Sequence, residues 1–88
     1  MSNSVTSASV AALADAVLTL LVDKYEAPAE TTAADTEFEL IGFDSLILVE
    51  VAVDLSRRYG TEVADDELQE AGTAAAVAEL LVAKGVRV

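Results

Sequence analysis

The spacing of the apolar residues is the feature that most limits how this chain can fold. In the first third of the sequence they recur at steps of three and four, at Val10, Leu13, Val17, Leu20, Leu21 and Tyr25. Such spacing places side chains on one face of a helix, whereas a strand would alternate at every second residue. Residues 45–59 and 74–84 show helical spacing again, and no segment has convincing strand alternation. We therefore predict an all-α fold.

The length of 88 residues suits a single domain. We predict that this domain covers residues 9–85. A flexible, serine-rich segment at 1–8 is expected before it, and a C-terminal tail at 86–88 after it. The first helix is expected to begin near Ser9, because either Ser7 or Ser9 can cap its first turn.

A long loop is predicted after the first helix. Pro28 is expected to end that helix, because the residue before a proline disfavours helical geometry. Residues 29–43 have no sustained period and include several threonines and a glycine. Loops of this length usually have their own packing or a function. We expect Phe38 and Ile41 to hold this one against the core.

Two more helices are predicted between the loop and the C-terminal third. Residues 45–59 form the longer one, between an N-cap at Asp44 and a terminating Gly60. A brief acidic helical turn at 66–70 follows and ends at Gly72. The run of carboxylates that opens this turn is more typical of a helix start than of a cation site, which needs alternating ligands.

The last predicted helix begins after Thr73, which can cap it, and ends at Gly85. Its core residues are expected to be Val77, Leu80 and Leu81. The expected architecture is thus a four-helix bundle with three main helices and a short third helix.

The second helix carries two apolar stripes rather than one. A regular core face is predicted at Leu48, Val51, Ala52, Leu55 and Tyr59. The other stripe consists of Leu46, Val49 and Val53, interleaved with polar residues. A surface helix needs only one buried stripe. The second stripe must therefore meet another helix or remain exposed for a partner, and Leu46 could also belong to the core.

Composition makes independent catalysis an unfavourable hypothesis. The chain has no cysteine and no histidine, so it lacks a thiolate nucleophile, a zinc thiolate and the commonest general base. A serine nucleophile would have no imidazole beside it. The hydrophobic fraction of 53% is nevertheless too high for a disordered acidic tail. We expect a folded, non-catalytic protein.

The net charge of −11, from 16 acidic and 5 basic residues, restricts the partners. Nucleic acids and anionic membranes are disfavoured because binding them requires lysine and arginine. Proteins with basic patches are favoured. No apolar run is long enough to span a membrane, and the N-terminus lacks the basic region of a signal peptide. We expect a cytoplasmic monomer.

The most informative motif is Gly42-Phe43-Asp44-Ser45-Leu46. A glycine-containing turn delivers Asp44 and Ser45 to a helix start, where several N–H groups lack partners. A phosphodiester on the serine hydroxyl would lie in the favourable field of that helix end. Taken alone, the Asp-Ser pair is also what an ordinary helix cap looks like.

The wider sequence resembles the acyl carrier protein family, in which Gly-x-Asp-Ser-Leu opens the second helix. The approach to the motif through Phe38 and Ile41 is similar, as are Val49-Glu50 and Tyr59-Gly60 downstream. The resemblance covers nearly the whole chain. It implies that a phosphopantetheinyl transferase attaches 4′-phosphopantetheine from coenzyme A to Ser45. Asp44, which would help position the site for the transferase, and Leu46 are the other residues expected at the cofactor site. Acyl groups would then be held as thioesters on the thiol of the arm.

The resemblance also implies partners. These are the transferase, acyltransferases, ketosynthases and tailoring enzymes, all with basic docking patches. The docking face expected on this chain consists of Leu46, Ile47, Val49, Glu50 and Val53.

Two departures bear on the pathway. Leu40 and Ile47 stand where fatty-acid-synthase carriers often have acidic residues. An apolar residue after Gly-Phe-Asp-Ser-Leu looks more like polyketide synthase carriers. Peptidyl carriers more often have Gly-Gly-x-Ser, so Phe43 argues mildly against them. A fatty-acid carrier, a peptidyl carrier and an acidic helical adaptor without a cofactor remain as alternatives.

Overall fold

The computed structural model describes the backbone of residues 2–86 and the side chains of residues 10–86. Its elements are α1 (Ser2–Tyr25), the 3₁₀ helix η1 (Phe38–Ile41), α2 (Ser45–Tyr59), α3 (Asp65–Ala71) and α4 (Ala74–Ala83). The described part of the chain contains no strand. The predicted all-α fold, with three main helices and a short third one, is confirmed.

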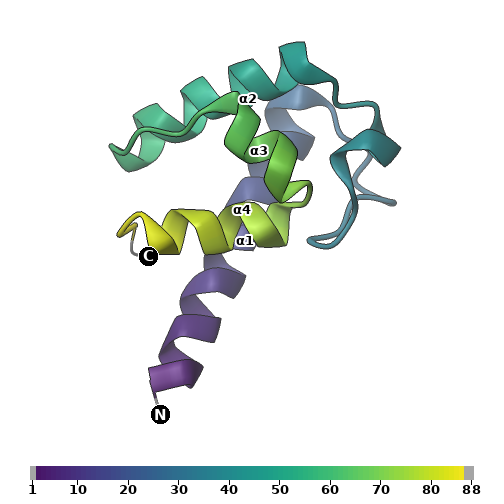
Figure 1. Ribbon diagram of the computed structural model, residues 1–88. Helices are drawn as coiled ribbons and strands as arrows, with labels where there is room; N and C mark the ends of the chain where they lie inside the picture. The colour runs from purple at the N-terminus through teal and green to yellow at the C-terminus, as the bar shows by residue number, and fades with distance from the viewer. Residues whose placement is uncertain (1, 87–88) are drawn as a thin grey trace.

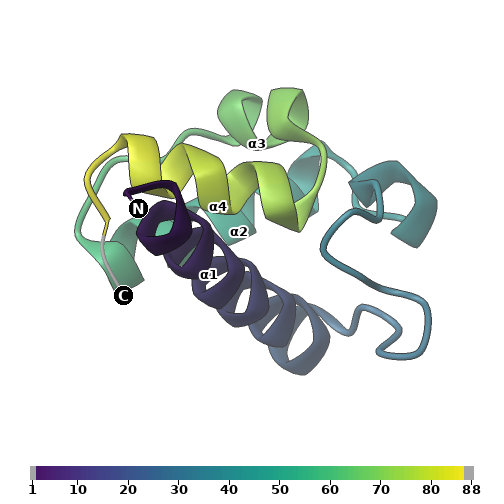
Figure 2. The same ribbon diagram turned by 90° about the horizontal axis from the view of Figure 1, so that it is seen from below.

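The helices surround one apolar core. α1 packs against α4, and α3 contacts both α2 and α4, so that α3 lies between them (Figure 1). The loop that carries η1 lies to one side, beyond the N-terminal end of α2, as Figure 2 also shows. The most deeply buried side chains are Leu13, Val17, Leu21, Val51, Leu55, Leu68, Val77 and Leu81. Burying each of them contributes about 1.5–3 kcal/mol. None of the described helices is long and apolar enough to cross a membrane.

α1 begins earlier than the sequence predicts. Helical backbone starts at Ser2 rather than at Ser9. No glycine or proline occurs between Ser2 and Tyr25, and extending an existing helix costs far less than nucleating one. The serine-rich segment can therefore continue the helix although it lacks an apolar stripe. The predicted flexibility of residues 1–8 stays a prediction.

The end of α1 is set by Glu26 and not directly by Pro28. Glu26 has a left-handed backbone with φ of 61°, a conformation that costs a residue with a side chain about 1–2 kcal/mol. It turns the chain so that the amide of Ala27 donates to the carbonyl of Leu21 at 2.9 Å. Ala27 is thereby buried in the core. Pro28 then follows the turn.

The long loop is fastened to the rest of the fold at two points. The amide of Phe38 donates to the carbonyl of Gly72 at 2.9 Å, and the amide of Ala75 donates to the carbonyl of Ala34 at 2.8 Å. Phe38 is buried and Ile41 is half-buried against the core, as predicted. The sequence did not reveal η1, because a single 3₁₀ turn is too short to produce a period.

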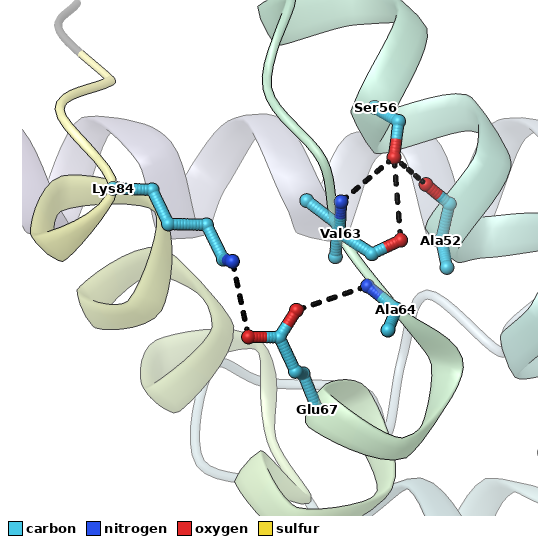
Figure 3. A network of polar contacts seen from close by, with 6 residues as sticks. All are labelled: Ala52, Ser56, Val63, Ala64, Glu67 and Lys84. Carbon is cyan, nitrogen blue, oxygen red and sulfur yellow. Dashed lines mark hydrogen bonds and ion pairs between the residues drawn. The ribbon is translucent and has the colours of Figure 1, made fainter.

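Polar contacts hold the connector between α2 and α3 (Figure 3). The hydroxyl of Ser56 donates to the carbonyl of Ala52 at 2.8 Å and accepts from the amide of Val63 at 3.0 Å. Val63 is buried, as the sequence predicts. The connector is therefore tied to the last turns of α2.

A second set of contacts links the start of α3 to the end of α4. The carboxylate of Glu67 accepts from the amide of Ala64 at 3.0 Å and pairs with Lys84 at 3.0 Å (Figure 3). Both contacts favour the ionised form and lower the pKa of Glu67, the amide contributing more than the lysine. The acidic run at 65–67 is thus a helix start, as predicted, and α3 is slightly longer than the predicted turn.

The C-terminal region differs from the sequence prediction in two details. Thr73 caps α4 through the amide of Ala76 at 3.1 Å, as predicted. Leu80, however, is only half-buried, and Ala74 and Ala78 occupy the core face instead. Val86, the first residue of the expected tail, is buried, and its amide donates to the carbonyl of Leu81 at 3.0 Å, whereas the domain boundary at 85 stays a prediction. Residues 87–88 of the expected tail lie outside the described part.

A polar clamp joins the end of α1 to the middle of α2. The hydroxyl of Tyr25 donates to Asp54 Oδ2 at 2.5 Å, and Lys24 Nζ lies 2.8 Å from the same oxygen. The hydrogen bonds from Lys24 and Tyr25 lower the pKa of Asp54. Burial, together with the hydrogen bond and charge of Asp54, raises the pKa of Tyr25. Both shifts follow from the pairing of a neutral phenol with an ionised carboxylate.

Replacing Asp54 by asparagine should lower the free energy of unfolding at pH 7 by about 1 kcal/mol, because two donors lose a charged acceptor. Since the pKa of Asp54 is lower in the folded state, its contribution is present above the unfolded value of about 4 and is lost as the pH falls through the folded value. Denaturant melts of both proteins from pH 7 to pH 3 should therefore converge. Asp23→Asn, at an exposed site on α1, controls for net charge. A difference that stays constant down to pH 3 would refute the clamp.

Candidate functional site

The start of α2 is built by a left-handed glycine and a capping aspartate. Gly42 has φ of 75° and ends η1, turning the chain toward α2. Asp44 is extended, and its carboxylate accepts a hydrogen bond from the amide of Ile47 at 3.1 Å. Its carbonyl accepts from the amide of Leu48 at 3.0 Å. The predicted N-cap is confirmed, and it makes Ser45 the first residue of the helix.

Ser45 is exposed at this helix start. Its position precedes the first intrahelical hydrogen bonds, so N–H groups of the first turn point away from the helix body. The helix dipole gives this end a partial positive charge. A negatively charged group attached to the hydroxyl would therefore be stabilised by the helix end while remaining in solvent.

Two phenyl rings fix the segment that leads to Ser45. Phe38 and Phe43 are both buried, and their rings stack with centroids 6.2 Å apart. The amide of Phe43 also donates to the carbonyl of Phe38 at 3.0 Å. The sequence predicted this packing role for Phe38 but not for Phe43. The position of Phe43 directly before the N-cap was the one signal that could have indicated its burial. The paired rings thus anchor in the core the segment that leads directly to Asp44 and Ser45.

A groove of about 650 Å³ lies beside Ser45. It is formed by η1, the first turn of α2 and the junction between α3 and α4. Apolar side chains line part of it, namely Phe38, Phe43, Leu48 and Ala71. Polar and acidic side chains line the rest, namely Glu37, Glu39, Gln69, Glu70 and Thr73. The hydroxyl of Ser45 thus stands next to a mixed apolar and acidic cavity.

The second apolar stripe of α2, here called the outer stripe, is exposed. Of the two options left open by the sequence, contact with another helix or exposure to solvent, the structure shows exposure. Leu46 is 74% exposed and therefore does not belong to the core. Val49 and Val53 are exposed as well, and so is Glu50 between them. Ile47 differs from the rest of the expected docking face, because it is half-buried and packs against the core.

The chemistry available at this site is that of a hydroxyl that accepts a group. Without histidine or cysteine in the chain, Ser45 has neither an imidazole base nor a neighbouring thiol. Within residues 2–86, no three Asp, Glu, His or Cys side chains are grouped so that they could hold a metal ion. The arrangement suits covalent attachment of a prosthetic group.

A comparison with protein families matches residues 15–81 to the family described as "Phosphopantetheine attachment site". The match covers well over half of the chain and includes the start of α2. The chain belongs to this family. Its members carry covalently attached 4′-phosphopantetheine and act as carrier proteins that interact with phosphopantetheinyl transferases and synthase enzymes. The cofactor and the carrier role expected from the sequence are thereby confirmed.

A comparison of the fold agrees. The chain is similar to a solved structure of a free-standing peptidyl carrier protein from an uncharacterized secondary metabolic pathway of Acinetobacter baumannii. The TM-score is 0.77 at 28% sequence identity, and the alignment covers 85% of this chain and 94% of the other. The expected carrier-protein fold is confirmed.

Proposed function

We propose that Ser45 is the residue that carries 4′-phosphopantetheine, and that the protein holds acyl or polyketide intermediates as thioesters on that arm. The observation that carries the proposal is the exposed hydroxyl of Ser45 at a capped helix start, inside the matched family region. Asp44 orients this hydroxyl by fixing the first turn of α2.

The residues around Ser45 fit such a group. The free N–H groups of the first turn favour a phosphodiester, and the exposed position leaves a path for the rest of the arm. The neighbouring groove offers apolar contacts from Phe43 and Leu48 and hydrogen-bonding groups from Gln69 and Thr73. The cofactor supplies the thiol that this cysteine-free chain lacks. The protein itself acts as a covalent shuttle and not as a catalyst, and we place it in the cytoplasm.

Two cargo classes have support. Ile47 after Gly-Phe-Asp-Ser-Leu resembles polyketide synthase carriers and favours malonyl-derived or polyketide intermediates. The similarity to a peptidyl carrier favours aminoacyl or peptidyl thioesters as the second candidate. A fatty-acid carrier has less support, because Leu40 and Ile47 replace acidic residues that are common there.

The outer stripe of α2 is the proposed docking face. Leu46, Val49 and Val53 expose apolar surface, with Glu50 among them. Such a pattern fits transferases, acyltransferases, ketosynthases and tailoring enzymes that present apolar contacts ringed by lysine or arginine. Ile47 contributes through the part of its side chain that the core leaves exposed.

Replacing Ser45 by alanine should abolish modification without unfolding the protein. An exposed hydroxyl outside the cap contributes less than about 0.5 kcal/mol. Intact mass should show one added phosphopantetheine on the parent protein after incubation with coenzyme A and a phosphopantetheinyl transferase, and none on the variant. Ser56→Ala serves as a control, because its hydroxyl is bound to backbone groups. Modification that persists in Ser45→Ala would refute the assignment.

Loading of the modified protein should separate the two cargo classes. A polyketide carrier should gain a malonyl group from malonyl coenzyme A and an acyltransferase. A peptidyl carrier should instead gain an aminoacyl group from an amino acid, ATP and an adenylating enzyme. Mass spectrometry of the holo protein detects the group added in either reaction. Repeating both reactions with the holo Glu50→Lys variant tests whether docking of each loading enzyme depends on this carboxylate. Exclusive aminoacylation would overturn the polyketide assignment and leave the carrier role intact.

Substitutions on the docking face should slow transfer without affecting stability. Val53→Ala should change the free energy of unfolding by less than about 0.5 kcal/mol, because Val53 is exposed. Val51→Ala, on the buried face of the same helix, should cost more than about 1 kcal/mol. Glu50→Lys should slow transfer by opposing basic partners. Parental transfer rates for both Val53→Ala and Glu50→Lys would place the recognition surface elsewhere.

A further inference from the structure

The exposed apolar surface is concentrated around Ser45. Among the residues whose side chains the structure describes, the large hydrophobic ones that are exposed are Leu40, Leu46, Val49 and Val53. All of them lie in the segment 40–53, which includes Ser45. Isolated exposed leucines are common on protein surfaces, but a group restricted to one functional segment is not expected from folding alone. Leu40, at 77%, is the most exposed of the group, and it lies on η1 rather than on α2.

The geometry of η1 explains why Leu40 faces solvent. A 3₁₀ helix has three residues per turn, so side chains three positions apart share a face. Phe38 and Ile41 therefore share the inner face, where both contact the core. Glu39 and Leu40 are left on the outer faces, and both are exposed. The amide of Phe38, bonded to the carbonyl of Gly72, fastens this turn to the body of the protein.

Along the chain, the charged residues on both sides of Ser45 are all acidic. From Tyr25 to Ser56 the sequence contains no lysine or arginine. Exposed carboxylates stand on both sides of Ser45, at Glu37, Glu39, Asp44 and Glu50. A partner that covers this surface must therefore bring apolar groups surrounded by basic ones.

We propose that Leu40 extends the docking surface from α2 onto η1, and that its occupant is the phosphopantetheinyl transferase that modifies Ser45. This inference rests on the proposed function. The transferase forms a bond between Ser45 Oγ and the phosphorus of coenzyme A that bears the pantetheine, and a base of the transferase takes the hydroxyl proton. The bond from this phosphorus to the bridging oxygen of the pyrophosphate breaks, and adenosine 3′,5′-bisphosphate leaves with that oxygen. The active site of the transferase must reach the hydroxyl itself, so its surface covers the residues before and after Ser45. Enzymes that act at the far end of the arm have no such requirement.

The test compares the rates at which apo variants accept phosphopantetheine from coenzyme A with a phosphopantetheinyl transferase. Leu40→Ala should raise KM about five- to tenfold and leave kcat and the melting temperature nearly unchanged, because truncating an apolar interface contact costs binding. Leu40→Met, which keeps the apolar volume, should restore the parental KM. Leu80→Ala, a half-buried leucine on α4, should not change KM. Salt should raise KM for the parent, because the proposed attraction is screened.

A parental KM for Leu40→Ala would overturn the inference and leave the proposed function standing, provided that the parent is modified at Ser45. An effect of Leu40→Ala on cargo loading alone would overturn the assignment of the transferase as occupant. Failure of the parent to accept phosphopantetheine at Ser45 would instead contradict the proposed function itself.

Discussion

The burial of Phe38 and Phe43 is the interaction on which the rest of this site depends. The two rings stack in the core at either end of a six-residue segment, and a backbone bond joins the same two residues. Without this pair, a loop of mostly small and polar residues would have little apolar surface to hold it in place. With it, the cap at Asp44 is presented at a fixed position. The position of Ser45 is thus set by the packing of residues that precede α2 in the chain.

Much of the fold could be predicted because its signals are local. The apolar period, the caps at Asp44 and Thr73 and the stops at Gly60 and Gly72 depend on a few neighbouring residues each. The structure confirms the caps and the stops, and it confirms the period with the exception of Leu80. The misses have physical reasons as well. The early start of α1 follows from the absence of glycine and proline before Ser9. Such an absence indicates a helix less strongly than a capping residue does, so the start was predicted at the cap. The left-handed turn at Glu26 occurs at a residue type that seldom adopts it.

The candidate site divides in the same way. Ser45 and its cap form a local motif, so the sequence alone could predict the cap at Asp44 and make Ser45 the candidate site residue. The groove beside Ser45 is not local, because one of its walls comes from residues 69–73. That wall is brought to the loop by the bond between Phe38 and Gly72, which no period or motif encodes. The spacing of the apolar residues likewise could not show whether Leu46 is exposed, because both stripes of α2 are apolar. Which stripe is buried depends on how α2 packs against the other helices.

The two stripes of α2 separate the residues that stabilise the fold from those of the proposed docking face. Leu48, Val51 and Leu55 are buried and contribute to the core, whereas Leu46 and Val53 contribute little to it because they remain in water. The clamp from Lys24 and Tyr25 to Asp54 lies next to Val53 along the chain and ties the middle of α2 to the end of α1. A helix free to rotate could bury the outer stripe in place of the inner one, with Ser45 turned away from its groove. The clamp holds α2 itself and the phenyl pair holds the segment before it, so both oppose such a rotation and favour the arrangement in which the outer stripe is exposed.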